Sequence, residues 1–411
     1  MNSSRRLSVL LLLLITINAS AQPTFLQFDR FNSPLPDNTC HAIAIDWQGR
    51  KWFGTEYGIA VYDDVNWTVY GTANSGLTNN SIKHITFDSQ HRAWISTQNG
   101  GVCVFDGSTW TSYTTLNSGI SSDFVRSVTI DRFDHAWVCT NNGLNYFDGL
   151  NWSVYNMSNS TLPVDNIAVM AIESDSLRWI GTVNGGFVKM QDTAFTTYNH
   201  STGNFPDNTI TSIIIDSSHI KWTACPAGAL VRFFNGAIFA YNTVSSLIPS
   251  NTLTMLAADS LQNFYIGSFD KGLIKRVGND YYNWDTQNSL MPDDLIYALA
   301  VERNGVVWCG TATQGVVRFD ENNVSGTGEL VTNSPLSIFP NPTSGLLHVN
   351  ATKTEMKSIR ISDTQGRSVV SKSFSSIASV TLDVKELPVG VYFLSVQTGD
   401  GIYSKKIIRT E

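Results

Sequence analysis

The pentapeptide Lys51-Trp-Phe-Gly-Thr55 is a repeated motif, because the chain of 411 residues contains six further versions of it. These are Ala93-Trp-Ile-Ser-Thr97, Ala136-Trp-Val-Cys-Thr140, Arg178-Trp-Ile-Gly-Thr182, Lys221-Trp-Thr-Ala-Cys225, Phe264-Tyr-Ile-Gly-Ser268 and Val307-Trp-Cys-Gly-Thr311. Their aromatic residues follow one another at intervals of 42 or 43 residues. A period of about 40 to 45 residues with several short strands per unit is typical of β-propeller blades. The sequence therefore predicts an all-β fold with seven blades.

Each repeat has the pattern of four strands. The first strand is apolar and ends in an acid six positions before the aromatic residue, where a carboxylate can accept hydrogen bonds from the turn backbone. These acids are Asp46, Asp88, Asp131, Glu173, Asp216, Asp259 and Glu302. A glycine is expected to lead each third strand: Gly58, Gly101, Gly143, Gly186, Gly228, Gly272 and Gly315. Primed hairpin turns are expected at Asp106-Gly107, Asp148-Gly149 and Asn235-Gly236.

The seventh repeat stops after its third strand, at Phe319-Asp320. The missing fourth strand is predicted at residues 25–31. Phe25-Leu-Gln-Phe28 precedes Asn32-Ser-Pro-Leu35 just as Trp67-Thr-Val-Tyr70 precedes Asn74-Ser-Gly-Leu77. We expect this N-terminal strand to complete blade 7, which leaves no exposed strand edge across the ring.

Residues 25–320 resemble the two-component regulator propeller repeat, whose pattern is an acid, a turn glycine, Trp-x-Gly-Thr and a second glycine. In that family such propellers are commonly periplasmic sensor regions of hybrid histidine kinases. No transmembrane, kinase or receiver segment follows the propeller in this sequence, so the resemblance implies a fold and a tendency to bind a ligand, not a signalling role.

The N-terminus has the pattern of a secretory signal peptide, predicted over residues 1–21. Arg5 and Arg6 precede the apolar run Leu7 to Ile17, and Ala19-Ser-Ala21 supplies the small residues of a cleavage site. An apolar run of eleven residues is too short to span a bilayer. The propeller is then expected over residues 22–320, followed by a linker over 321–335 and a second domain over 336–411.

The second domain shows short alternating strands typical of a small β-sandwich. Three segments resemble the type A sorting domain of the type IX secretion system of Bacteroidota: Phe339-Pro-Asn-Pro-Thr-Ser-Gly345, Asp363-Thr-Gln-Gly-Arg367, and Leu387-Pro-Val-Gly-Val-Tyr-Phe393 followed by Lys405-Lys-Ile-Ile. The resemblance implies the type IX secretion machinery as a partner. It also implies transport across the outer membrane, followed by release or by attachment to the outer surface.

The two domains differ in charge. Residues 22–329 carry a net charge of -12, and residues 330–411 carry +3. The acidic balance argues against nucleic acid as a partner, because phosphates require a basic surface. Five cysteines, Cys40, Cys103, Cys139, Cys225 and Cys309, form no C-x-x-C pair and are expected to be small buried hydrophobic residues.

The seven internal copies separate scaffold from candidate site. An Asn or Asp precedes every first strand and is therefore interpreted as scaffold: Asn38, Asn80, Asp123, Asp165, Asn208, Asn251 and Asp294. Three residues further on, the repeats diverge to His41, Lys83, Arg126, Ala168, Thr211, Thr254 and Tyr297. In ring order, Tyr297, His41, Lys83 and Arg126 form a contiguous arc at the predicted mouth of the central channel. Tyr57 and Phe269, in loops between second and third strands, are further candidates as exposed aromatic residues of a binding rim.

A cationic arc on an acidic domain favours an anionic or sugar-acid ligand. No H-E-x-x-H, P-loop, G-x-S-x-G or calcium-loop pattern occurs, so no cofactor or metal site is predicted. The favoured function is that of an exported, non-catalytic module that binds a glycan, an anionic ligand or a surface protein. Two alternatives stay open. One is an extracellular polysaccharide lyase or hydrolase with its chemistry around His41, Lys83, Arg126 and Tyr297, and the other is a ligand-sensing partner of a membrane receptor.

Overall fold

The computed structural model describes residues 23–203, 205–321, 336–341, 343–351, 355–363, 367–398 and 402–410. The chain divides into two compact units, Met1–Val324 and Ser325–Glu411. The predicted signal peptide, and the predicted linker apart from Glu321, lie outside the described residues.

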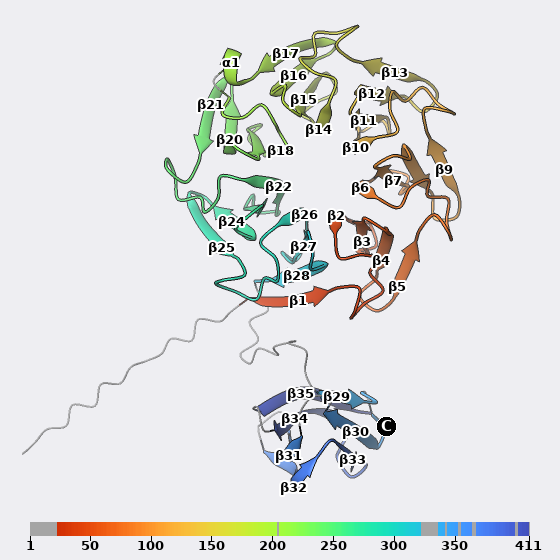
Figure 1. Cartoon of the computed structure of the whole chain (residues 1–411), viewed down its shortest axis with the longest axis vertical. Helices are drawn as coiled ribbons and strands as arrows, with labels where there is room; N and C mark the ends of the chain where they lie inside the picture. The colour runs from red at the N-terminus through yellow and green to blue at the C-terminus, as the bar shows by residue number, and fades with distance from the viewer. Residues whose placement is uncertain are drawn as a thin grey trace, which may run out of the picture. The chain divides into compact units, whose positions relative to one another are not determined.

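The first unit is a seven-bladed β-propeller, in which seven four-stranded antiparallel sheets are arranged in a ring about a common axis (Figure 1). Blade 1 consists, from the innermost strand outward, of β2 (Cys40–Ile45), β3 (Lys51–Thr55), β4 (Gly58–Tyr62) and β5 (Trp67–Tyr70). Blade 2 consists of β6 (Ile82–Phe87), β7 (Ala93–Thr97), β8 (Val102–Phe105) and β9 (Trp110–Tyr113). Blade 3 consists of β10 (Val125–Ile130), β11 (Ala136–Thr140), β12 (Gly143–Phe147) and β13 (Trp152–Tyr155).

Blades 4 to 6 repeat this order. Blade 4 consists of β14 (Ile167–Ile172), β15 (Leu177–Thr182), β16 (Phe187–Gln191) and β17 (Ala194–Tyr198), and the short helix α1 (His200–Gly203) follows it. Blade 5 consists of β18 (Ser212–Ile215), β19 (Lys221–Cys225), β20 (Ala229–Phe234) and β21 (Ala237–Tyr241). Blade 6 consists of β22 (Leu253–Ala258), β23 (Phe264–Ser268), β24 (Leu273–Val277) and β25 (Asp280–Trp284).

Blade 7 is built from both ends of the propeller, as the sequence predicts. Its inner strands are β26 (Ile296–Val301), β27 (Val307–Thr311) and β28 (Val316–Asp320), and its outermost strand is β1 (Thr24–Phe28). Thr24 lies opposite Asp320 and Phe28 lies opposite Val316 in the β1–β28 ladder. Strands β1 and β28 therefore lie side by side at the rim in Figure 1, and β26 contacts β2 to close the inner ring.

The acid that ends each first strand does more than cap its turn. Asp88 Oδ1 accepts hydrogen bonds from the backbone N–H groups of Gln90 and Arg92, while its Oδ2 accepts one from the indole of Trp94 at 2.8 Å. The same acid-to-indole bond occurs in blades 1, 4, 5 and 7, at 2.6 to 3.0 Å. It satisfies the polar atom of an otherwise buried aromatic side chain. The acid six residues before the aromatic residue thus stabilises the packing of the blade as well as its turn.

Blade 3 supplies a natural control for this bond. Trp137 Nε1 is buried and has no hydrogen-bond partner among the described residues, although Asp131 still caps its own turn. We expect Asp88→Ala to lower the free energy of unfolding by about 2 kcal/mol more than Asp131→Ala, because only the first orphans a buried indole N–H. Urea unfolding of the two variants measures the difference, and equal losses would contradict this role for the acid.

Two local expectations are wrong. In blade 5 the residue with left-handed backbone is Ala229 (φ 61°) and not Gly228. The turn between the second and third strands runs over five residues, from Cys225 to its partner Ala229, as it does from Thr97 to Gly101 in blade 2, so the left-handed position is its last residue. Of the three expected primed turns, only Asn235-Gly236 has positive φ at both residues. Asp106 and Asp148 begin four-residue loops, in which each carboxylate accepts two backbone N–H groups. These two turns are therefore stabilised by a side chain and not by the I′ geometry.

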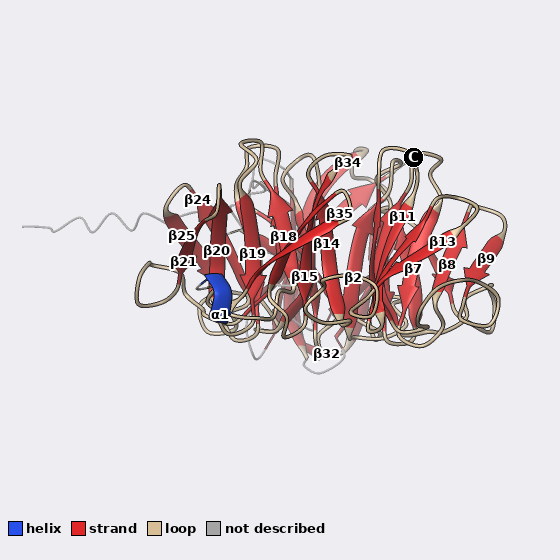
Figure 2. Cartoon of the chain, turned by 90° about the horizontal axis from the view of Figure 1, so that it is seen from above, coloured by secondary structure: helices blue, strands red, loops and turns tan. Residues whose placement is uncertain are grey.

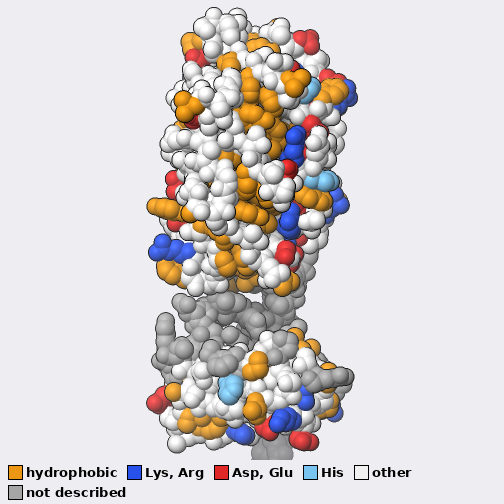
Figure 3. All heavy atoms as spheres, turned by 90° about the vertical axis from the view of Figure 1, so that its right-hand side faces the viewer, with side chains coloured by type: hydrophobic (Ala, Val, Ile, Leu, Met, Phe, Trp, Pro, Cys, Tyr) orange, Lys and Arg blue, Asp and Glu red, His pale blue; other side chains and the backbone are white. Residues whose placement is uncertain are grey.

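The propeller surface is poor in charge, in keeping with a chain in which only 15% of residues are charged. Seen from the edge, its strands run between two loop-bearing faces (Figure 2). On the side shown in Figure 3, most of the surface is uncharged, and many of the Lys and Arg side chains lie beside Asp or Glu. The five cysteines are buried and free, as expected.

The second unit is a β-sandwich. One sheet has the order β29-β30-β33, with β29 (Leu336–Phe339), β30 (Leu346–Ala351) and β33 (Ser379–Asp383). The other has the order β32-β31-β34-β35, with β31 (Met356–Ser362), β32 (Ser368–Ile377), β34 (Gly390–Thr398) and β35 (Ile402–Arg409). The core between them includes Leu347, Ile359, Leu382, Leu394 and Ile407.

Candidate functional site

The loops that reach the channel mouth are fixed by the predicted Asn/Asp scaffold. In all seven blades this side chain accepts a hydrogen bond from the backbone N–H eight residues earlier, at 2.7 to 2.9 Å. The bond ties the loop arriving from the outermost strand to the start of the next innermost strand. Every first strand therefore begins at a fixed point of this face.

A β-bulge then aims the variable side chain. The pairing of first and second strands shifts register at one residue in six blades, and the skipped residues are His41, Lys83, Arg126, Ala168, Thr254 and Tyr297. A bulge leaves one residue out of the ladder and redirects its side chain. In these six blades the diverging position that the sequence singles out is thus the bulge position, where the residue stands outside the ladder.

Four of these side chains meet at one cavity. His41, Lys83, Arg126 and Tyr297 line a cavity of about 370 Å³ together with Gln98 and Phe124. The rings of His41 and Tyr297, from blades 1 and 7, lie 5.0 Å apart between centroids. The structure therefore brings together the contiguous arc that the sequence singles out, and its ligand-binding role stays a prediction.

Glu56, in the loop between β3 and β4, organises part of this cavity. Its Oε2 lies 3.0 Å from His41 Nε2 and 3.3 Å from Lys83 Nζ, and it accepts a hydrogen bond from Ser81 Oγ at 2.9 Å. Burial alone would raise the pKa of Glu56, but hydrogen bonds from Ser81 and Lys83 outweigh burial and lower it. Burial and the nearby Lys83 lower the pKa of His41 below its ordinary value of 6.5. At neutral pH the carboxylate is therefore charged and the imidazole is neutral.

Arg126 has a different environment. Its Nε donates to Asn166 Oδ1 at 3.0 Å, and its guanidinium carbon lies 4.9 Å from the ring centroid of Phe124. Burial lowers the pKa of Arg126, yet an arginine remains charged in proteins. This arrangement holds a permanent cation against a neutral amide and an aromatic ring.

Tyr57 and Phe269 occupy separate places. Tyr57 is 66% exposed and lines a second cavity of about 430 Å³, together with Glu56, Asn79, Asn80 and Ser81. Gln98 lines both this second cavity and the first one. Phe269 is 44% exposed and lines neither cavity. Tyr57 therefore lies beside the cationic arc, whereas Phe269 belongs to a different part of the ring.

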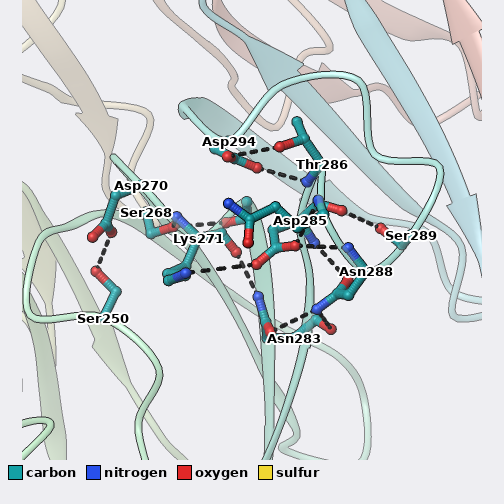
Figure 4. Close-up of polar contacts among 12 residues, drawn as sticks. Ser250, Ser268, Asp270, Lys271, Asn283, Asp285, Thr286, Asn288, Ser289 and Asp294 are labelled. Carbon is teal, nitrogen blue, oxygen red and sulfur yellow. Dashed lines mark hydrogen bonds and ion pairs between the residues drawn. The ribbon is translucent and has the colours of Figure 1, made fainter.

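Figure 4 shows the loop that carries Phe269. Asp270 accepts a hydrogen bond from Ser250 at 2.5 Å, and the Lys271 backbone N–H donates to Ser268 at 2.8 Å. Lys271 Nζ lies 3.8 Å from a carboxylate oxygen of Asp285. The polar groups of this loop are thus engaged with blade 6 itself.

Sequence reasoning missed Glu56, Gln98, Phe124 and Asn166 as parts of the site. Phe124 and Asn166 directly follow the scaffold Asp123 and Asp165, a position where the repeats also diverge. Comparing that position across the seven copies would have found both. Glu56 and Gln98 belong to variable loops, and no sequence signal shows that one of them reaches a lysine 27 residues away.

The described residues contain no group of three or more His, Cys, Asp or Glu side chains placed to hold a metal ion. His41 and Glu56 form the one imidazole–carboxylate pair that involves a residue of the first cavity. Such a pair can hold or transfer a proton, so the geometry is compatible with general acid–base chemistry at His41.

Comparison with known families identifies the C-terminal unit. Residues 337–410 match the model of the secretion system C-terminal sorting domain. The predicted sorting domain is therefore confirmed, and it implies interaction with the type IX secretion machinery. The protein is exported, and is either secreted or attached to the outer surface of the outer membrane.

Solved structures confirm the propeller fold. The extracellular domain of BT3049 from B. thetaiotaomicron, described as a hybrid two component system, is 19% identical, with a TM-score of 0.65 over 95% of this chain and 58% of that chain. PorZ of Porphyromonas gingivalis, an essential surface component of its type IX secretion system, is 14% identical, with a TM-score of 0.58 over 91% of this chain and 60% of its own. Virginiamycin B lyase from Staphylococcus aureus is 11% identical, with a TM-score of 0.58 over 73% of this chain and 99% of its own.

The chain thus spans about three fifths of the length of the first two of these proteins. No curated protein matches it in sequence. Within the described part of the chain, no helix has the length and apolar character needed to cross a membrane.

Proposed function

We propose that the propeller is a non-catalytic binding module that takes a small anionic ligand at the mouth of its channel, with Arg126 as the anchor. The observation that carries this proposal is the convergence of four bulge side chains from blades 7, 1, 2 and 3 on one cavity. Residues shared by all blades make the scaffold, while these residues differ from blade to blade. A site built at the variable positions of a repeat is what a specific binding function requires.

Charge supports an anionic ligand. The propeller region carries a net charge of -12, yet Lys83 and Arg126 both line this cavity. A guanidinium presents planar donors that match a carboxylate in a bidentate geometry. Phe124 and Tyr297 add apolar walls, as is usual for small-molecule sites.

We expect Arg126→Ala to weaken binding of acidic oligosaccharides about 10- to 100-fold, because a hydrogen bond to a charged group contributes about 1.5–3 kcal/mol. Binding of the full chain to an array of neutral and acidic glycans, followed by titration of the best acidic ligand, measures the change. Arg303→Ala is the matched control, since it removes the same charge from an exposed turn at the opposite face. Equal binding by wild type and Arg126→Ala would contradict the proposal.

A second candidate is a lyase or hydrolase acting on extracellular polyuronides. The His41–Glu56 pair at 3.0 Å is the observation that favours it, because an imidazole held by a carboxylate can act as a general base. Release of unsaturated or reducing products from polyuronides by the wild-type chain, lost in His41→Ala, would support the enzyme over the binding module.

A further inference from the structure

The two basic side chains of the channel-mouth cavity differ in whether an acidic group lies beside them. Lys83 Nζ lies 3.3 Å from Glu56 Oε2, so this ammonium already has an anionic partner. Arg126 has no acidic partner among the described residues, and its Nε donates a hydrogen bond to the neutral amide of Asn166. The cavity thus offers one uncompensated positive charge, not two.

Glu56 is held in the charged state and in place. Ser81 donates to the same oxygen at 2.9 Å, and His41 Nε2 lies 3.0 Å from it. Because three groups converge on one oxygen, Glu56 cannot swing away from Lys83 without losing all three contacts. An incoming anion would therefore find the ammonium group of Lys83 already paired with the carboxylate of Glu56.

The free donors of Arg126 suit a single carboxylate. A guanidinium has five N–H donors, and the bond to Asn166 uses one, at Nε. The two terminal nitrogens remain as a pair of donors of the kind that binds a carboxylate. A second negative charge on the ligand would be desolvated with no uncompensated cation to receive it.

We propose that Glu56 makes this site selective for ligands with one negative charge, namely carboxylates, and against phosphate monoesters. The inference rests on the proposed binding function and adds the chemical class of the ligand and the residue that sets it. Arg126 binds the carboxylate of the ligand. Glu56 disfavours phosphate monoesters because it neutralises Lys83, which would otherwise bind their second negative charge.

The test compares two ligands that share a sugar ring and differ in their anionic group. D-Glucuronate carries one charge, and D-glucose 6-phosphate carries close to two at pH 7.5. Calorimetric titration of the full chain is expected to show about tenfold preference for glucuronate. In Glu56→Gln, affinity for glucose 6-phosphate is expected to rise about tenfold, while affinity for glucuronate changes less than about threefold.

Two further variants keep the test sharp. Glu56→Gln with Lys83→Met removes both charges, and is expected to restore the wild-type preference, because Arg126 is again the single uncompensated cation. Asp270→Asn changes the net charge equally from the corresponding loop of blade 6 and is expected to leave the preference unchanged.

The possible failures are distinguishable. An unchanged ratio of affinities in Glu56→Gln, with both ligands still lost in Arg126→Ala, would overturn the role of Glu56 and leave the binding site standing. Absence of binding of either ligand to wild type, or binding unaffected by Arg126→Ala, would count against the proposed function itself.

Discussion

Deletion of residues 22–32 is expected to unfold the propeller at ambient temperature or to lower its free energy of unfolding by about 5 kcal/mol. This segment contains β1, the outermost strand of blade 7, which pairs with β28 over five residues. Phe25 packs on Phe319 at 5.2 Å between ring centroids. Phe28 lies 5.8 Å from Trp308 in blade 7 and 5.5 Å from Trp67 in blade 1. The strand therefore joins the first and last blades as well as completing one sheet.

The magnitude follows from what is lost. Truncating a packed Phe costs about 3–5 kcal/mol, and deletion removes two of them, both half-buried, together with a strand ladder. A loss of about 5 kcal/mol is comparable with the whole stability of many domains. Thermal and urea unfolding, followed by tryptophan fluorescence, measure it. An unchanged melting temperature would contradict closure by this strand.

A permuted chain separates loss of the strand from loss of the terminus. Because Thr24 lies opposite Asp320, a short turn can join Asp320 directly to Thr24 as a hairpin. A chain that starts at Asn32 and ends at Phe31 would then hold β1 by covalent connection to β28. Its stability is expected to return to within about 1 kcal/mol of wild type, since moving exposed termini perturbs a fold little.

Gly315→Ala is expected to destabilise the same closure by about 3 kcal/mol or more. Gly315 has φ +81°, and a Cβ added to it would lie 2.1 Å from the backbone oxygen of Phe28. Because that atom is backbone, relief of the clash requires β1 itself to move. The N-terminal strand should therefore loosen before the rest of the ring. Hydrogen exchange at residues 24–28, together with urea unfolding, detects this order.

Gly236→Ala is the matched control for backbone strain. Gly236 has nearly the same φ, +83°, but an added Cβ would meet nothing within 4 Å. It is expected to lose only about 1 kcal/mol, the cost of a left-handed conformation for a residue with a Cβ. Similar losses in the two variants would show that φ, and not the contact with β1, decides the effect.

Much of the fold can be predicted from the sequence repeat. The spacing of Trp52 and its counterparts determines the blades, and the likeness of residues 25–35 to 67–77 determines the closure. Local exceptions escape the pattern. Ala229 takes the glycine position of blade 5, and Trp137 lacks the indole partner that its repeat supplies elsewhere. Both exceptions depend on how one particular loop or side chain packs, and the pattern shared by the seven repeats does not contain that information.

The seven blades, the exchanged strand, the sorting domain and the arc formed by Tyr297, His41, Lys83 and Arg126 are all predicted from the amino-acid sequence. The blades, the strand and the arc are predictable because seven copies in one chain reveal which positions are constant and which vary, whereas the sorting domain is predicted from its resemblance to a known family. The three-dimensional structure adds that these variable residues are bulge residues around one cavity, and that Glu56 neutralises Lys83 while Arg126 stays uncompensated. The physical reason is that charge pairing depends on distances of a few ångströms across the gap between blades. Periodicity along the chain places residues in blades, but it does not set which side chains meet between them.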